Sequence, residues 1–527
     1  MQKLNKRLTH RTTSTNFTPL AISFIYAFIC LTLIGCSVES PKNEEIYDLV
    51  LIGGRVLDPE SGFDGIANIA IQGKTIKKIS MEHLSGKEVI NVEGLVVTPG
   101  FIDLHSHAMS PLGQQLQVKD GVTTALELEA GVYPIKATPK LFNGKARINY
   151  GASVGHMAIR QRLFEFFEKP HLLSPRTVLG TMSTKQSEPN SAFIKPADAS
   201  QLKGIQKHLQ TGLNSGGLGI GLLLDYFSAA LSKAELDMVF TVAADADMPV
   251  FVHIRRGLPG DTAGLLEIII LAKKFQASVH ICHINGAAMS GIEEHLKLVN
   301  SARADGVDIT TEAYPYNAGS TKISAAVFNK DWQSIFGISY GDVEWAETGE
   351  RFSDEKMWNE YKRRYPDGQV IHHYGKEPWT MLSLQEPDVI VASDAMPIRS
   401  LNERVHPRGI GTFSRVLRKF FDNSFNNLTL IELIGKMTLL PAKRLENFAP
   451  AFTKKGRLQV GADADITVFD PTTISDRATY KSPLSSSIGI IYVLVNGDFV
   501  VKDANIVKDS YPGSFIRSAN LSMLTDN

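Results

Sequence analysis

Histidines and carboxylates with the spacing of metal ligands stand at the ends of several apolar segments of this sequence. The first segment ends in His105-Ser-His107, and because successive side chains of a strand point to opposite faces, both imidazoles lie on one face. The second segment ends with Glu127 and Glu129, again two residues apart. Single residues of the same kind end three later segments: His253, His283 and Asp394. Imidazole and carboxylate together suit zinc, so the sequence predicts a metal site where these segments meet.

The segments that must position these residues lie between residues 99 and 452, and most are separated by amphipathic, helix-like stretches. They are Phe101–His107, Val122–Glu129, Arg147–Gly155, Leu218–Leu224, Pro249–Arg255, Ser278–Ile284, Val307–Glu312 and Asp388–Asp394. Eight alternating β–α units predict an α/β fold of the (β/α)8 TIM-barrel type, in which functional side chains stand at the carboxyl ends of the strands. The alternative is a doubly wound open sheet, but no glycine-rich phosphate loop follows any of these segments.

The two ends of the chain differ from this middle. Residues 47–98 and 453–512 both consist of short, alternating, strand-like segments broken by turn residues. We therefore expect the two ends to pair as one small β domain, with the barrel over residues 99–452. A long stretch near 322–370, rich in Trp and Tyr, follows the seventh strand, where a barrel places an active-site loop, and is a candidate lid.

The charge balance bears on the class of partner. Lys+Arg and Asp+Glu both number 55 among 527 residues, so the formal net charge is zero. A nucleic-acid-binding protein shows a basic excess or stripe, so we expect no nucleic-acid partner. The three cysteines are too few for a disulfide scaffold in a chain of this length.

The N-terminus has the features of an export signal. Residues 1–20 hold four basic residues and no acidic one, and the apolar run Ala21–Gly35 is shorter than the roughly 20 residues of a membrane-spanning helix. The run ends in Leu33-Ile-Gly-Cys36, which resembles the lipobox of bacterial lipoproteins. The resemblance implies a signal peptide over 1–35, a lipid on the Cys36 thiol and a tether over 36–46. The implied product is exported from the cytoplasm and anchored to a membrane of the cell envelope. A plain signal peptide or a short anchor helix is the alternative.

Longer motifs resemble the metal-dependent amidohydrolase superfamily: Pro99-Gly-Phe-Ile-Asp-Leu-His-Ser-His107, Gly121-Val-Thr-Thr124, His253, His283 and Ser393-Asp394. Three others are similar, more narrowly, to the D-aminoacylases, the N-acyl-D-amino-acid deacylases: Tyr314-Pro-Tyr-Asn-Ala-Gly-Ser-Thr321, His406-Pro-Arg-Gly-Ile-Gly-Thr-Phe413 and Lys436-Met-Thr-Leu-Leu-Pro-Ala442. The resemblance covers residues 47–512. It implies a barrel beside a small β-sandwich, hydrolysis of N-acyl-D-amino acids, and one or two zinc ions held by the four histidines and Asp394.

Departures from these families leave the predicted site short of an anionic ligand. Many amidohydrolases carry a carboxylated lysine on strand four, and D-aminoacylases use a strand-two cysteine; Gly217–Asp225 holds no lysine and Leu126–Gly131 no cysteine. We expect Glu129 to be the substitute ligand, because it lies nearer the mouth than Glu127, whose burial without a partner would be costly. The alternative for Glu127 is a pair with Arg147 or with a ligand histidine. Asn285 also stands where subgroup members often have a lysine, so the side-chain preference stays open.

The remaining roles follow from the chemistry of amide hydrolysis. Asp394 is expected to take a proton from the attacking water and pass it to the leaving amine. Tyr314, by resemblance to the subgroup, donates to the developing oxyanion. Arg255, Ser320 and Arg408 are the candidates for binding a substrate carboxylate, since arginine offers a two-pronged donor; Arg408 pairing with an acid such as Glu403 is the alternative.

Three other readings of the whole chain remain open at this point. One is another amidohydrolase activity on the same scaffold, such as a cyclic-amide hydrolase or a dipeptidase. Another is a non-catalytic lipoprotein that binds an acylated ligand, and a third is a structural role in the envelope. The intact set of predicted ligands and Asp394 favour the enzyme.

Overall fold

A computed structural model describes residues 45–164, 191–227 and 230–519. Eight parallel strands, one from each predicted segment, form its central sheet in chain order. They are β6 (Phe101–Asp103), β7 (Val122–Val132), β8 (Asn149–Gly155), β9 (Ile220–Leu223), β10 (Val250–His253), β11 (Val279–Ile281), β12 (Ile309–Ala313) and β16 (Val389–Val391). A parallel bridge between Ser106 and Ala395 joins the first strand's end to the last's. The predicted (β/α)8 barrel is confirmed.

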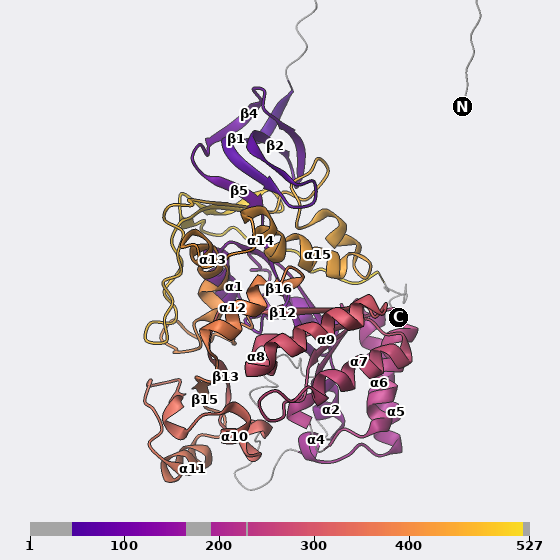
Figure 1. The fold of residues 1–527 in the computed structure, drawn as a ribbon. Helices are drawn as coiled ribbons and strands as arrows, with labels where there is room; N and C mark the ends of the chain where they lie inside the picture. Colours follow the sequence, from indigo (N-terminus) through magenta and orange to yellow (C-terminus); the bar gives the residue numbers. More distant parts are fainter. Residues whose placement is uncertain (1–44, 165–190, 228–229, 520–527) are drawn as a thin grey trace, which may run out of the picture. The chain divides into compact units, whose positions relative to one another are not determined.

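Helices follow these strands and cover the outside of the barrel (Figure 1), so that each strand is buried on both faces. They are α1 (Pro111–Gln117), α2 (His156–Phe164), α4 (Ser191–Ile194), α5 (Ala199–Asn214), α6 (Lys233–Asp245), α7 (Ala263–Phe275), α8 (Ile284–Ala288), α9 (Ile292–Ala304), α12 (Glu377–Gln385), α13 (Arg408–Phe421), α14 (Leu430–Met437) and α15 (Leu439–Glu446). Side chains such as those of Ser232 and Asp198 cap the first turns of α6 and α5 by accepting hydrogen bonds from backbone N–H groups.

Strands from the two ends of the described chain pair in one sheet of nine, as expected. The N-terminal strands are β1 (Ile46–Asp58), β2 (Phe63–Gln72), β3 (Thr75–Ser80), β4 (Ser85–Asn91) and β5 (Val96–Pro99). The C-terminal strands are β17 (Ile466–Phe469), β18 (Ile490–Val495), β19 (Asp498–Lys502) and β20 (Asn505–Ile506). Antiparallel pairing of β5 with β17 joins the two groups, while the exact division into domains stays a prediction. The predicted signal peptide and nearly all of the predicted tether, residues 1–44, lie outside the described residues.

The aromatic stretch after the seventh barrel strand folds around a core of its own. β13 (Gly319–Lys322), β14 (Val343–Trp345) and β15 (Gln369–His372) form a three-stranded sheet beside α10 (Trp332–Phe336) and α11 (Glu355–Arg364). Trp332, Trp345 and Trp358 are buried in this core. Residues of β13 and β15 line the pocket described below, so this insertion covers the site, whereas a lid movement stays a prediction.

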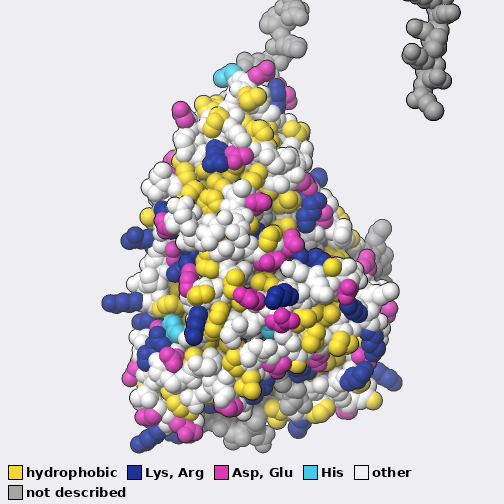
Figure 2. All heavy atoms as spheres, in the orientation of Figure 1, with side chains coloured by type: hydrophobic (Ala, Val, Ile, Leu, Met, Phe, Trp, Pro, Cys, Tyr) yellow, Lys and Arg dark blue, Asp and Glu magenta, His cyan; other side chains and the backbone are white. Residues whose placement is uncertain are grey.

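Basic and acidic side chains are mixed over the face of the described residues that Figure 2 shows, without a segregated patch of one sign. This is the distribution that the balanced composition predicts.

Candidate metal centre and active site

The carboxyl ends of the barrel strands bring the predicted metal-binding side chains together. His105 and His107 follow β6, His253 is the last residue of β10, and His283 and Asp394 follow β11 and β16. Glu129 lies near the end of β7. All six side chains are buried. The strands are parallel, so their carboxyl ends share one edge of the barrel, which is why residues up to 289 positions apart in the chain meet here.

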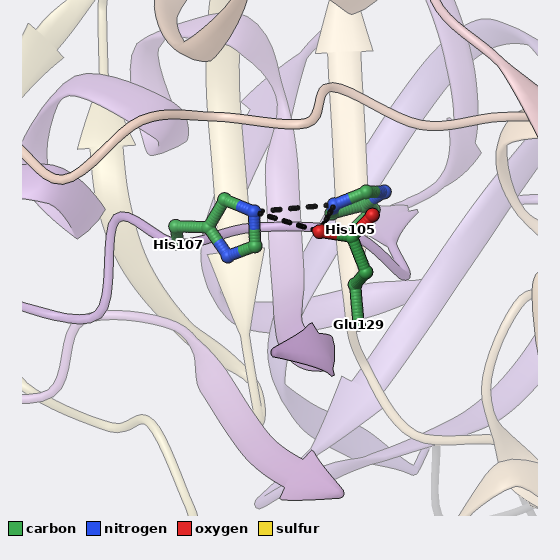
Figure 3. A group of neighbouring side chains, drawn as sticks. All are labelled: His105, His107 and Glu129. Atoms are coloured by element: carbon green, nitrogen blue, oxygen red, sulfur yellow. Dashed lines mark hydrogen bonds and ion pairs between the residues drawn. The ribbon is translucent and has the colours of Figure 1, made fainter. Parts of the chain in front are cut away.

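A bulge in β7 directs Glu129 into the site. The register between β7 and β8 shifts between Glu127 and Val132. The backbone N–H groups of Ala130 and Gly131 donate to Glu127 Oε1 at 3.0 and 3.2 Å, which stabilises the irregular segment. Bulges re-aim side chains next to active sites, and Figure 3 shows the Glu129 carboxylate directed at the two histidines of the first strand.

Four donor atoms around the first pair of histidines have the spacing of a zinc site. His105 Nε2 lies 3.3 Å from His107 Nε2, and Glu129 Oε2 lies 3.2 and 3.4 Å from these two nitrogens. Asp394 Oδ1 lies 3.4 and 3.5 Å from the same nitrogens. Ligands about 2.0–2.1 Å from a tetrahedral zinc ion are about 3.4 Å from one another. The donor set therefore fits zinc in its chemistry, and these five distances match those between ligands of a tetrahedral zinc ion.

The other oxygen of Glu129 faces a second pair of histidines. Glu129 Oε1 lies 2.9 Å from His253 Nδ1 and 2.8 Å from His283 Nε2, and the two nitrogens are 3.1 Å apart. Glu129 thus offers one oxygen to each of two groups of donors. This is the arrangement of a carboxylate that bridges two metal ions.

Two further carboxylates hold the first pair of histidines in place. His105 Nδ1 lies 2.5 Å from Glu312 Oε1, and His107 Nδ1 lies 2.7 Å from Glu127 Oε2. Ionised carboxylates accept from Nδ1–H, which leaves the Nε2 lone pairs directed at the centre. Of the two partners expected for Glu127, the structure gives the histidine, because Arg147 donates to backbone carbonyl groups.

Glu312 is a residue that the sequence reasoning missed. Its signal was present, since it ends the seventh predicted strand and so stands at the same edge as the ligands. Glu312 stands at the end of β12, two strands from β6 around the barrel, and a carboxylate there is a natural partner for an imidazole that binds metal.

The electrostatics of the site favour a bound cation. Burial lowers the pKa of the His105 imidazole, but Glu129, Asp394 and Glu312 outweigh it and raise that pKa well above its ordinary value. Burial alone would raise the pKa of Glu129, yet the surrounding histidines hold it well below its ordinary range. Burial lowers the pKa of His253 to about 4, so this ring is uncharged at neutral pH.

The backbone is strained at two of these residues. His283 has a φ of 33° and Asp394 a φ of 52°, in the left-handed region that side chains other than Gly seldom adopt. Such strain persists where the surroundings enforce it, and it clusters at functional sites. At Asp394 the surroundings include Arg408, whose Nε donates to the Asp394 carbonyl oxygen at 2.5 Å.

Three of the four side chains predicted to handle the substrate line one pocket with the metal-binding residues: Tyr314, Ser320 and Arg408. The Tyr314 hydroxyl lies 3.1 Å from that of Tyr374. Burial raises the pKa of Tyr314 well above its ordinary value, so the phenol keeps its proton and can donate it in a hydrogen bond. The Ser320 hydroxyl is buried and has no hydrogen-bond partner among the described residues.

Arg255 is not brought into this pocket, which corrects its predicted placement. Its Nε donates to Glu267 at 2.9 Å, and the next residue, Arg256, lines the pocket instead. The strand ends at His253, so Arg255 lies in the following loop, where strand alternation no longer sets the direction of a side chain. The loop is set by Asp225, which accepts hydrogen bonds from the backbone N–H and Nε of Arg256 at 3.4 and 3.1 Å.

Arg408 reaches the pocket from the start of α13, and its acidic partner is Asp394 and not Glu403. Arg408 Nη2 lies 2.9 Å from Asp394 Oδ2, whereas Glu403 accepts from the backbone N–H of Arg399. The guanidinium carbon also lies 4.9 Å from the centre of the Tyr314 ring. Arg408 is therefore placed both to orient Asp394 and to face a bound substrate.

Replacing Arg408 separates these two contributions. We expect Arg408→Ala to lower kcat for every substrate, because Asp394 loses its partner. We expect an additional loss in kcat/KM, about 2–5 kcal/mol for a buried pair, for substrates with a free α-carboxylate. Arg408→Lys should also be impaired, because the ammonium group of lysine cannot make the two parallel hydrogen bonds that the planar guanidinium makes to a carboxylate. The measurement compares N-acetyl-D-amino acids with their C-terminal amides. An equal loss for both would mean that Arg408 acts on Asp394 alone.

Comparison with known proteins agrees with this geometry. The chain is 27% identical over 480 residues to N-acyl-D-glutamate deacylase of Alcaligenes xylosoxydans xylosoxydans, covering 88% of this chain and 95% of that protein. It is 27% identical over 481 residues to D-aminoacylase of the same organism, covering 87% and 95%. The solved structure of N-acyl-D-glutamate deacylase from Bordetella bronchiseptica, complexed with zinc and a phosphonate inhibitor, shares the fold with a TM-score of 0.70 at 24% identity, over 90% of this chain and 100% of that one. Residues 96–323 match the model of the amidohydrolase family. In its barrel fold, and over residues 96–323 in its sequence, the chain is similar to the amidohydrolase family.

Proposed function

We propose that this protein hydrolyses the amide bond of N-acyl-D-amino acids, giving a carboxylate and a free D-amino acid, with one or two zinc ions as cofactor. The observation that carries the proposal is the pair of carboxylate oxygens 3.2–3.5 Å from the two histidine nitrogens, beside a pocket that Tyr314 and Arg408 line. The relatives named N-acyl-D-glutamate deacylase and D-aminoacylase match nearly the whole chain, which supports this substrate class.

Different side chains bind the metal, transfer the proton and stabilise the developing negative charge in this reaction. His105, His107, Glu129 and Asp394 would hold one zinc ion, and Glu129 with the second pair of histidines would hold another. Bound zinc supplies a Lewis acid for the amide carbonyl and lowers the pKa of a water molecule toward neutrality. Asp394 accepts the proton of the attacking water and delivers it to the leaving amine. Tyr314 donates a hydrogen bond to the oxygen on which charge develops, and the insertion with β13 and β15 limits the access of bulk water.

The proposal is tested by the release of free amino acids from matched substrates. Protein stripped with a chelator and reloaded with zinc is assayed on N-acetyl-D- and N-acetyl-L-amino acids, with a hydantoin as a cyclic-amide control. We expect zinc-dependent turnover of the D-substrates and little of the L-substrates. Zinc-dependent turnover of the cyclic amide alone would instead identify a cyclic-amide hydrolase, and zinc binding without any turnover would identify a binding protein.

We further propose that the protein is exported and anchored to a membrane through a lipid on Cys36. Leu33-Ile-Gly-Cys36, behind a basic start and a short apolar run, supports this proposal. Among the described residues, no helix combines the length and the hydropathy needed to cross a membrane.

Cys36→Ser should therefore abolish lipidation and release or misprocess the protein, because the hydroxyl does not replace the thiol as acceptor. Cell fractionation and the mass of the mature chain measure this. Normal processing of the variant, with the protein still in the membrane fraction, would contradict the proposal.

A further inference from the structure

The pocket holds a second buried guanidinium, Arg256, which contacts a different part of the site from Arg408. Arg256 Nη2 lies 2.9 Å from His253 Nε2, next to the second pair of histidines, whereas Arg408 contacts Asp394 next to the first pair. The Arg256 side chain is 9% exposed and lines the pocket. The two arginines therefore contact different members of the metal-binding set.

Arg256 shares its acidic partner, Asp225, with a second cation, Lys330. Asp225 accepts from Arg256 Nε at 3.1 Å, but its other oxygen lies 2.8 Å from Lys330 Nζ. The ring centre of Phe336 lies 5.2 Å from the guanidinium carbon and orients its plane. Within the described part of the chain, Nη1 of Arg256 makes no hydrogen bond, so donor capacity remains for a ligand.

The subgroup resemblance leads one to expect a cation at position 285 instead. Asn285 there is neutral, and its Nδ2 donates to the carbonyl oxygen of Tyr314 at 3.0 Å. In this chain the loop after β10 thus contributes a cation, Arg256, to the pocket, whereas position 285 in the segment after β11 contributes none.

We propose that Arg256 binds a second carboxylate of the substrate, so that the enzyme prefers N-acyl-D-amino acids with two negative charges. The inference rests on the proposed function. The α-carboxylate is adjacent to the leaving amine and so lies on the side of Asp394 and Arg408. A carboxylate on the amino-acid side chain, or at the far end of the acyl group, extends further and meets Arg256. Arginine binds carboxylates through two parallel hydrogen bonds, which are strong where water is excluded.

Two pairs of substrates, each differing only in one charge, test the proposal and locate the carboxylate. N-acetyl-D-glutamate is compared with N-acetyl-D-glutamine, and N-succinyl-D-alanine with its succinamoyl analogue, on the zinc-loaded enzyme. We expect the charged member of one pair to have a kcat/KM at least about 30-fold higher, as for a buried charge pair. The pair that shows the preference identifies the source of the carboxylate as the side chain or the acyl group.

Arg256→Gln should abolish this preference, while the neutral member of each pair loses much less. Arg255→Gln is the matched control, because Arg255 has the same charge one position earlier and contacts Glu267 outside the pocket. Arg256→Lys keeps the charge and should retain part of the preference. Zinc content and melting temperature show whether each variant is folded. If a variant does not fold, the kcat/KM ratios of the wild-type enzyme within the two substrate pairs still test the proposal.

The outcomes separate the two proposals. Equal kcat/KM values within both pairs for the wild type, or a preference that survives Arg256→Gln, would overturn the inference and leave the deacylase activity in place. A purely structural Arg256 would reduce both members of each pair alike, which also overturns it. No turnover of any N-acyl-D-amino acid would overturn the proposed function itself, and the inference with it.

Discussion

An Asp394→Asn variant is expected to keep bound zinc and to lose turnover by about 10²–10⁴-fold. Asparagine has nearly the same shape and still offers an oxygen toward His105 and His107, but its carboxamide cannot accept the proton of the attacking water. Asn also tolerates the left-handed backbone found at Asp394, with a φ of 52°, better than most residues do. The loss is therefore expected in the chemical step and not in folding.

Steady-state kinetics with parallel measurement of zinc content test this expectation. The relevant pattern is a reduced kcat at normal zinc stoichiometry and normal melting temperature. A variant with wild-type kcat would remove Asp394 from the proton transfer, and a variant that lost its zinc would show that Asp394 acts mainly as a ligand.

The second large effect is expected for Glu129→Ala, in binding of the metal. This change removes one donor from each of the two groups, because Oε2 faces His105 and His107 and Oε1 faces His253 and His283. Zinc affinity should fall by more than the 10–100-fold that loss of a carboxylate supporting a ligand histidine causes. Competition with a chelator of known affinity measures the change.

Glu127→Gln is the matched control for this variant, since Glu127 is two residues away and contacts His107 only through Nδ1. It should weaken zinc binding less, because it orients a ligand and is not one. Unchanged zinc affinity in Glu129→Ala would remove Glu129 from the metal site, and a larger loss in Glu127→Gln would exchange the two roles.

Most of the site was predictable because it depends on strand order and side-chain alternation. His105 and His107 share a face by their spacing, and each later ligand ends its own apolar strand. The eight strands themselves were recognisable from apolar segments separated by amphipathic ones. These features are local in the sequence, and the barrel brings them together by a fixed rule, since parallel strands end at one edge.

The parts that were missed depend on loops and on contacts between distant residues. Arg255 and Arg256 are adjacent, and only the hydrogen bonds of Asp225 to the loop decide which of them enters the pocket. The partner of Arg408 is Asp394, 14 residues away, and not the nearby Glu403, because α13 begins at Arg408 and aims its side chain back at the strand end. The bulge that places Glu129 likewise arises from pairing between β7 and β8, which no single segment encodes.

The central claim is that Glu129 joins two metal positions in one hydrolytic site. Anomalous diffraction at the zinc edge, from crystals of the protein grown with zinc, tests it most directly. The expected result is one peak enclosed by His105, His107, Glu129 and Asp394, and at higher zinc concentration a second peak at His253 and His283, with one Glu129 oxygen bound to each. Peaks remote from these residues, or zinc at the histidines with Glu129 turned away, would contradict it.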